Sequence, residues 1–146
     1  MNQLVEIAVR ALSPGLNDPF TAITCVDQLG SVLCRLATRE MPSRYRYDHQ
    51  NQLRVIAPAN TFPEITDAAL NQVRQYSRSS VAVTIRLLEM IAVVAGFVHR
   101  PEDRTALLRH AEMIARGAME GLPEREDRRV VEERCQAVIE LCSEAV

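Results

Sequence analysis

The sequence predicts an all-α fold of five to six helices packed around a central apolar helix, with one small β-hairpin. Apolar residues recur at helical spacing through most of the 146 residues, and prolines and glycines interrupt that spacing at several points. Between residues 41 and 58 the pattern changes to short aromatic and β-branched runs. We therefore expect a single helical domain over residues 1–146, with a hairpin insertion at about 44–58.

Residues 2–38 are predicted to form two helices joined by a tight loop. An apolar stripe runs through 2–12, and Ser-Pro-Gly at 13–15 ends it, because the residue before a proline avoids helical angles and glycine permits a stop. Asp18 and Pro19 are typical of an N-cap and a first helical residue, so a second helix is expected to about residue 38. Within it, Gly30 is expected to allow close approach of another helix. The expected apolar face of this second helix comprises Phe20, Ile23, Val26, Leu29, Gly30, Leu33, Leu36 and Ala37.

The hairpin is predicted from two short segments, Tyr45–Asp48 and Gln52–Ile56, which are aromatic or β-branched and are separated by polar residues. A lone two-stranded hairpin is marginally stable in water. We therefore expect it either to lean on the helices or to pair with another chain.

Four more helices are predicted after residue 60. Pro63 opens the third, and Ser79 and Ser80 are expected to cap the fourth, which covers 81–98. The fourth is apolar on nearly every side, which is typical of a helix buried in a core or an oligomer interface, so we expect it at the centre of the packing. The fifth begins at Pro101 and the sixth near residue 124. The inward residues are expected to be Ala106, Leu107, Ala111, Ile114, Ala118 and Met119 in the fifth helix, and Val131, Cys135, Val138 and Cys142 in the sixth.

The bulk composition argues against several classes of partner. The net charge of −2 does not favour nucleic acid, so no nucleic-acid partner is expected. No apolar run reaches the roughly 18–20 residues of a membrane span, and polar residues interrupt the nearest one, 81–98. No signal peptide is indicated, and we expect this chain to be soluble. The four cysteines, Cys25, Cys34, Cys135 and Cys142, lack metal-binding spacing and are expected to be reduced and buried.

Residues 4–27, together with 72–76 and 86–89, resemble the C-terminal part of a bacterial family of predicted membrane proteins of unknown function (domain of unknown function number twenty-two fifty-four). The signature Ala-Leu-Ser-Pro-Gly-Leu-Asn-Asp-Pro-Phe-Thr-Ala at 11–22 carries the resemblance, which extends over essentially the whole chain. In that family, membrane-spanning helices and a further soluble segment precede this region. The resemblance thus implies either an excised soluble domain or an unusually short relative. It also implies an inner-membrane parent with this domain in the cytoplasm, and it brings no reaction, catalytic residue or cofactor.

The loop between the first two helices is the best candidate for a ligand site. Hydroxyl, amide and carboxylate groups gather around one helix N-terminus, where backbone N–H groups and the helix dipole could hold a small anion or polar ligand. Asp18 counts against an anion, because it already occupies the positive end. The structural alternative, which we favour, is that these groups cap the helix and close turns, and an interdomain contact is the next alternative. The candidate residues are Ser13, Asn17, Asp18, Thr21 and Thr24.

No residue pattern predicts a metal site, a nucleotide site or a catalytic centre. His49, His99 and His110 lie in different elements without metal-ligand spacing, and we interpret them as surface or locally bonded side chains. There is no glycine-rich phosphate loop. A serine or cysteine nucleophile stays open, although nothing in the sequence pairs one with a base.

Five arginines lie before and within the hairpin and could face anionic lipid if the parent protein lies at a membrane surface. Acidic Glu40 and Asp48 lie among them, so we favour a solvated face instead. These arginines are Arg35, Arg39, Arg44, Arg46 and Arg54.

The favoured function is a non-enzymatic, soluble interaction or regulatory domain of a bacterial membrane protein, contacting the membrane-spanning segment of its parent. We expect a homo-oligomer, because the fourth helix is apolar all round and the hairpin has too few partners. The alternative is a small-ligand or anion-binding domain, or an enzyme, that uses the Ser13–Thr24 loop. No cofactor is expected in either case.

Overall fold

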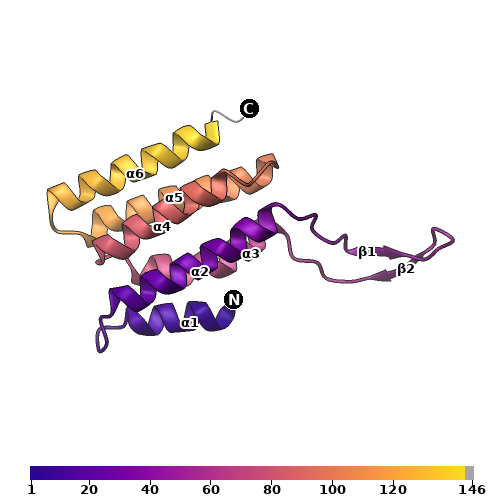
Figure 1. Cartoon of the computed structure of the whole chain (residues 1–146), viewed down its shortest axis with the longest axis horizontal. Helices are drawn as coiled ribbons and strands as arrows, with labels where there is room; N and C mark the ends of the chain where they lie inside the picture. Colours follow the sequence, from indigo (N-terminus) through magenta and orange to yellow (C-terminus); the bar gives the residue numbers. More distant parts are fainter. Residues whose placement is uncertain (144–146) are drawn as a thin grey trace.

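The structure is a computed structural model, and it describes residues 1–143. The described residues form six helices and one antiparallel hairpin (Figure 1), so the predicted all-α fold with a small hairpin is confirmed. In chain order the elements are α1 (Asn2–Ala11), α2 (Pro19–Ala37), β1 (Tyr45–Tyr47), β2 (Leu53–Ile56), α3 (Phe62–Tyr76), α4 (Val81–Ala95), α5 (Pro101–Gly121) and α6 (Arg125–Ser143).

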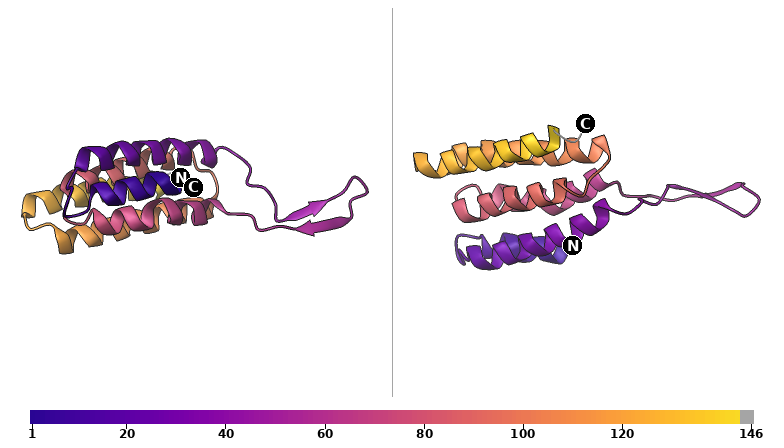
Figure 2. Two further views of the ribbon diagram at one scale, coloured as in Figure 1. Left: turned by 90° about the horizontal axis from the view of Figure 1, so that it is seen from below. Right: turned by 45° about the horizontal axis from the view of Figure 1, so that its top comes forward.

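The helices pack in two rows of three. α2, α4 and α6 lie side by side in one row, and α1, α3 and α5 form the second row, which packs against the first. Figure 2 shows the helices with their axes roughly aligned. α4 lies between α2 and α6 and also packs against α5, and about half of its residues are buried. The predicted central apolar helix is therefore confirmed.

The helix starts follow capping chemistry, which the sequence predicted in part. Asp18 caps α2 as expected. α3 begins one residue before Pro63, because Thr61 and Glu64 form a capping box: the Thr61 amide donates to the Glu64 carboxylate at 2.8 Å, and the Glu64 amide donates to the Thr61 hydroxyl at 3.4 Å. Ser80 takes the N-cap position of α4, yet its side chain makes no capping hydrogen bond to that helix.

Two predictions need correction, one about the end of α4 and one about the apolar face of α2. α4 ends at Ala95 rather than near residue 98, because the chain tightens at Gly96, whose amide bonds to the Val93 carbonyl at 3.2 Å. Phe20 was expected in the core but is 80% exposed, since it lies in the first turn of α2 where no neighbouring element covers it. The other positions of that α2 face are buried or half-buried, as are the expected inward residues of α5 and α6.

Gly30 has the role that the sequence predicted. A Cβ atom built on Gly30 would lie 2.4 Å from Cγ of Met90, so α2 and α4 approach each other more closely there than a larger residue would allow. The close approach brings the middle of α2 against the central helix and positions the cavity described below.

α2 is the one described helix that is long and apolar enough, by length and composition, to cross a membrane. The sequence had pointed to 81–98 as the nearest such run, but α4 has 15 residues and would span about 22 Å, less than the roughly 30 Å of a bilayer core. A helix in the core of a globular protein can have the same length and composition. Here α2 packs between α1 and α4.

The hairpin projects from the end of the bundle as an arm between α2 and α3 (Figures 1 and 2). We call residues 38–61 the arm. All seven strand residues are exposed, so the strands do not lean on the described helices. Of the two expectations for the hairpin, pairing with another chain is the one that stays a prediction.

Candidate functional site

The Ser13–Thr24 loop forms local hydrogen bonds that fix the turn. The Ser13 hydroxyl donates to the Arg10 carbonyl at 2.7 Å, and the Thr24 hydroxyl donates to the Phe20 carbonyl at 3.0 Å. Asn17 has a φ of 45°, in the left-handed region that asparagine tolerates better than most residues. The backbone amide of Asn17 donates to the Ser13 carbonyl at 2.9 Å. These are the bonds expected of a helix-to-helix joint.

Asp18 acts as the N-cap of α2. Its carboxylate accepts from the Thr21 hydroxyl at 2.6 Å and from the Thr21 amide at 3.1 Å. The hydroxyl bond, and then the amide bond, lower the pKa of Asp18, so a negative charge stays at the helix N-terminus where an anion would have to bind. All five candidate residues thus make local hydrogen bonds at the turn, the cap or the first turns of α2, and ligand binding by Ser13, Asn17, Asp18, Thr21 and Thr24 stays a prediction.

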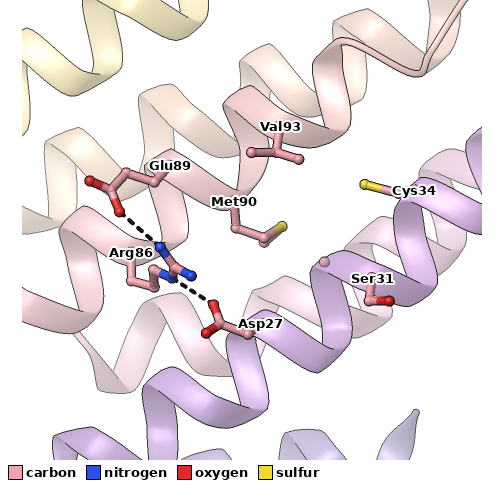
Figure 3. Close-up of a pocket in the computed structure, with 8 residues that line it drawn as sticks. Asp27, Ser31, Cys34, Arg86, Glu89, Met90 and Val93 are labelled. Carbon is pink, nitrogen blue, oxygen red and sulfur yellow. Dashed lines mark hydrogen bonds and ion pairs between the residues drawn. The ribbon is translucent and has the colours of Figure 1, made fainter.

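A cavity of about 260 Å³ lies elsewhere, in the groove between α2 and α4 (Figure 3). Gly30 and Met90 line it where the two helices approach most closely, and the side chains of Cys34 and Val93 lie beside Met90 in Figure 3. The sequence did not predict this groove, because helical periodicity shows which face of each helix is apolar and not how two faces meet. The remaining lining residues are Asp27, Ser31, Arg86 and Glu89.

Arg86 lies at one end of the cavity between two carboxylates, as Figure 3 shows. Its guanidinium donates to Asp27 on α2 at 2.6 Å and to Glu89 on α4 at 3.3 Å, and Glu89 also faces Arg134 of α6 at 3.7 Å. The Asp27 bond, followed by the Glu89 bond, raises the pKa of Arg86. Because these side chains are all more than a third exposed, the pairs orient the three helices of one row and add little stability.

Two side chains of the groove, Ser31 and Cys34, carry a hydroxyl and a thiol. Cys34 is the thiol that lines it, and burial raises the pKa of that thiol, so the sulfur is held in its weakly nucleophilic protonated form. Among residues 1–143 no group of three or more histidine, cysteine, aspartate or glutamate side chains is placed to hold a metal ion.

His110 corrects the expectation that the three histidines are surface or locally bonded. It is fully buried on α5, and its Nε2 lies 2.8 Å from the Asp67 carboxylate of α3, 43 residues earlier in the chain. Arg109 donates to the same carboxylate. His110 lies at helical spacing from Leu107 and Ile114, and that spacing was the signal that could have placed it inward.

The hairpin carries an apolar face that the sequence pattern alone concealed. Tyr45 lies opposite Ile56 and Tyr47 opposite Leu53, while the register skips Arg54 in a β-bulge. Residues directly opposite each other in an antiparallel pair share a face of the sheet. The bulge therefore places Leu53 and Ile56, three residues apart, on the same face as both tyrosines. We call Tyr45, Tyr47, Leu53 and Ile56 the arm face, and their exposed fractions are 46%, 57%, 46% and 66%.

The turn of the hairpin holds the arm in shape. The Asp48 carboxylate accepts from the backbone amides of Gln50 at 2.8 Å and Gln52 at 3.0 Å. It also accepts from Nε of Arg54 at 2.6 Å. Asn51 supplies the left-handed residue of the turn, with a φ of 58°. The Gln52 amide and then the Arg54 guanidinium lower the pKa of Asp48, so these bonds persist at neutral pH.

Comparison with known proteins places the sequence in a family. The family described as "Predicted membrane protein (DUF2254)" matches residues 1–93. Uncharacterized proteins of Mycobacterium tuberculosis and Mycobacterium bovis are 34% identical to the chain over 131 residues, which are 90% of this chain and 25% of those proteins. The chain therefore spans about a quarter of the length of these relatives. No solved structure matches the chain.

Proposed function

The chain belongs to the DUF2254 family of predicted membrane proteins, and from that premise we propose that it is a non-enzymatic interaction domain of a bacterial membrane protein, on its cytoplasmic side. The observation that carries the proposal is the projecting arm. The four apolar or aromatic side chains of the arm face are exposed on one side of the hairpin, and monomeric soluble proteins rarely leave a contiguous apolar surface without a use. Val55 is exposed on the opposite side, paired with Arg46.

The arm is built for contact and not for the stability of the bundle. Its strands bury no side chain against the described helices, and its turn is held by its own hydrogen bonds. A two-stranded hairpin of this size is marginally stable in water, so its exposed apolar face favours a partner outside the bundle. A preformed arm loses less conformational entropy when it binds than a flexible loop would.

Replacement of residues 44–57 by a short Gly-Ser linker is expected to leave the helical bundle folded. The thermal midpoint should change by less than about 4 °C, because the removed strands contribute less than about 1 kcal/mol to the bundle. Circular dichroism would measure both the helix content and the thermal midpoint. Loss of the cooperative transition would contradict the proposal, since it would assign the arm a structural role.

Self-association belongs to the same proposal, through the groove between α2 and α4. α4 is covered by α2, α5 and α6, and its uncovered apolar residues include Val93, which is 59% exposed and lines the cavity. A two-fold interface places the same patch against itself. Arg86 is already paired with Asp27 and Glu89 of its own chain, so the apolar residues of the groove are what a second copy would contact.

Val93→Asp is expected to convert a dimer into a monomer, because it places an unpaired carboxylate in the apolar contact. Size-exclusion chromatography with light scattering over a series of protein concentrations would show the change in mass. Ile56→Ser, on the arm, is the matched control and should leave the dimer intact. A monomeric unmodified chain at every concentration would refute self-association and leave the arm unaffected.

A further inference from the structure

We propose that the arm docks onto the surface of an anionic lipid bilayer, with the arm face in the membrane interface and the neighbouring arginines over the lipid headgroups. This inference rests on the proposed interaction function and names the partner of the arm. The sequence alone favoured a solvated face for these arginines. The register of the hairpin changes that balance, because it gathers four apolar or aromatic side chains on one exposed face and leaves Arg46 on the opposite face, paired with Val55.

The chemistry of the arm face fits the membrane interface. Tyrosines are enriched where the headgroups meet the hydrocarbon, because the ring is apolar and the hydroxyl stays in water. Tyr45 and Tyr47 lie on this face together with Leu53 and Ile56, so the aromatic and aliphatic groups point the same way. An interfacial element needs such an apolar face together with cationic groups, and it does not need the length of a membrane span.

The charge of the chain is divided between the arm and the helices. The arm carries four arginines against Glu40 and Asp48, a net charge of +2, while the rest of the chain carries thirteen arginines and seventeen acidic residues, a net charge of −4. An anionic surface therefore attracts the arm and repels the bundle, and the projection of the arm keeps the two apart (Figure 1). All four arm arginines, Arg39, Arg44, Arg46 and Arg54, are exposed.

The same charges disfavour pairing between the arms of two copies, because two arms of +2 repel each other. Docking of one arm on the acidic bundle of a second copy is electrostatically allowed. That arrangement would require an apolar surface on the bundle to receive the arm face, and it is treated below as an outcome that overturns the proposal.

The experiment uses the full chain with a tryptophan placed in the arm. The sequence has no tryptophan, so Tyr47→Trp provides a single fluorescent reporter on the arm face and keeps an aromatic side chain there. This variant is titrated with vesicles of phosphatidylcholine alone and with vesicles that contain about a third phosphatidylglycerol. We expect a blue shift with the anionic vesicles and a much weaker one with the neutral vesicles, and the affinity should fall as salt is added.

Two substitutions separate the charged and apolar contributions. Arg46→Gln, on the face opposite the arm face, is expected to weaken binding to the anionic vesicles about fivefold, because its charge acts on the surface across the hairpin, over about one Debye length of roughly 10 Å. Ile56→Ser is expected to weaken it about tenfold, because an aliphatic side chain no longer leaves water. The matched controls on the bundle are Arg116→Gln and Phe20→Ser, and they should bind like the parent variant.

Each remaining outcome overturns the proposal in a distinct way. Absence of a blue shift with anionic vesicles at low salt excludes the lipid partner. Equal binding by the arm and bundle variants shows that the arm is not the contact. A blue shift that grows with protein concentration without lipid, and that Ile56→Ser removes, assigns the arm to a second copy. None of these results changes the conclusion of the arm-replacement experiment. That experiment asks whether the bundle folds without the arm, so a failure of the lipid proposal can be distinguished from a failure of the proposed interaction function.

Discussion

Ile91→Ala is expected to lower the free energy of unfolding by about 2–5 kcal/mol, the range for removing three methyl or methylene groups from a packed core. Ile91 is fully buried on α4, in the helix that packs against α2, α5 and α6. Because α4 is packed against three other helices, the structure can collapse only partly into the space left by the removed groups. Urea unfolding monitored by circular dichroism would measure the loss.

The matched control makes the same chemical change on the surface. Ile56→Ala removes the same atoms from a side chain that is 66% exposed on the arm, and it should change the free energy of unfolding by less than about 0.5 kcal/mol. If the two variants lose similar amounts, or if Ile91→Ala costs less than about 1 kcal/mol, α4 is not the centre of the core. The description of the fold would then have to change.

The helices could be predicted from the sequence because their signals are local. Asp18 followed by Pro19 specifies the start of α2 by cap chemistry, and helical spacing correctly predicted that Val131, Cys135 and Val138 of α6 are buried. Gly30 was also interpreted correctly, since a glycine in the middle of an apolar face has few uses other than close helix packing. Each of these predictions depends on residues within a few turns of one another.

The features that matter for function depend on contacts between distant residues, and a periodic pattern cannot show which faces meet. The hydrogen bond between buried His110 and half-buried Asp67 joins two helices, and neither residue has a distinctive neighbour in the sequence. The arm face was concealed for a different reason. Strict alternation would put Leu53 and Ile56 on opposite faces, and one bulged residue, Arg54, reverses that conclusion.

The loop signature shows why a distinctive motif need not be a ligand site. Its serine, aspartate and threonines are explained by bonds to Arg10, Thr21 and Phe20 that lie within four residues. Such bonds satisfy unpaired backbone groups at the end of one helix and at the start of the next helix. The signature therefore supports membership of the family more strongly than it supports a binding role.

Acidification from pH 8 to pH 5 is expected to destabilise the chain through His110. Burial lowers the pKa of His110 below its ordinary value of about 6.5, and the hydrogen bond to Asp67 opposes this effect without cancelling it. The positive charges of Arg109 and Arg74 also lower that pKa. Protonation would add a proton at Nδ1, which is buried and has no hydrogen-bond partner among the described residues.

The sign of the effect follows from proton counting. Between the lowered pKa of His110 in the folded chain and its ordinary value in the unfolded chain, the unfolded chain binds more protons, so stability rises with pH. The contribution is complete above about pH 6.5 and is lost as the pH falls below that value. Because each pH unit corresponds to about 1.4 kcal/mol, the loss by pH 5 is at most about 2 kcal/mol.

Urea unfolding at pH 5, 6, 7 and 8 would measure this dependence. His110→Gln keeps an N–H donor that can reach Asp67 but cannot titrate, so the free energy of unfolding of this variant should be nearly constant from pH 5 to pH 7. The exposed His99→Gln should retain the dependence of the unmodified chain. Carboxylates such as Asp18 and Asp48, whose pKa values are lowered, titrate below pH 5. They therefore do not contribute to the change in the free energy of unfolding between pH 5 and pH 8. A free energy of unfolding that stays constant or rises on acidification of the unmodified chain would show that His110 is accommodated as a cation, in contradiction to its buried Nδ1.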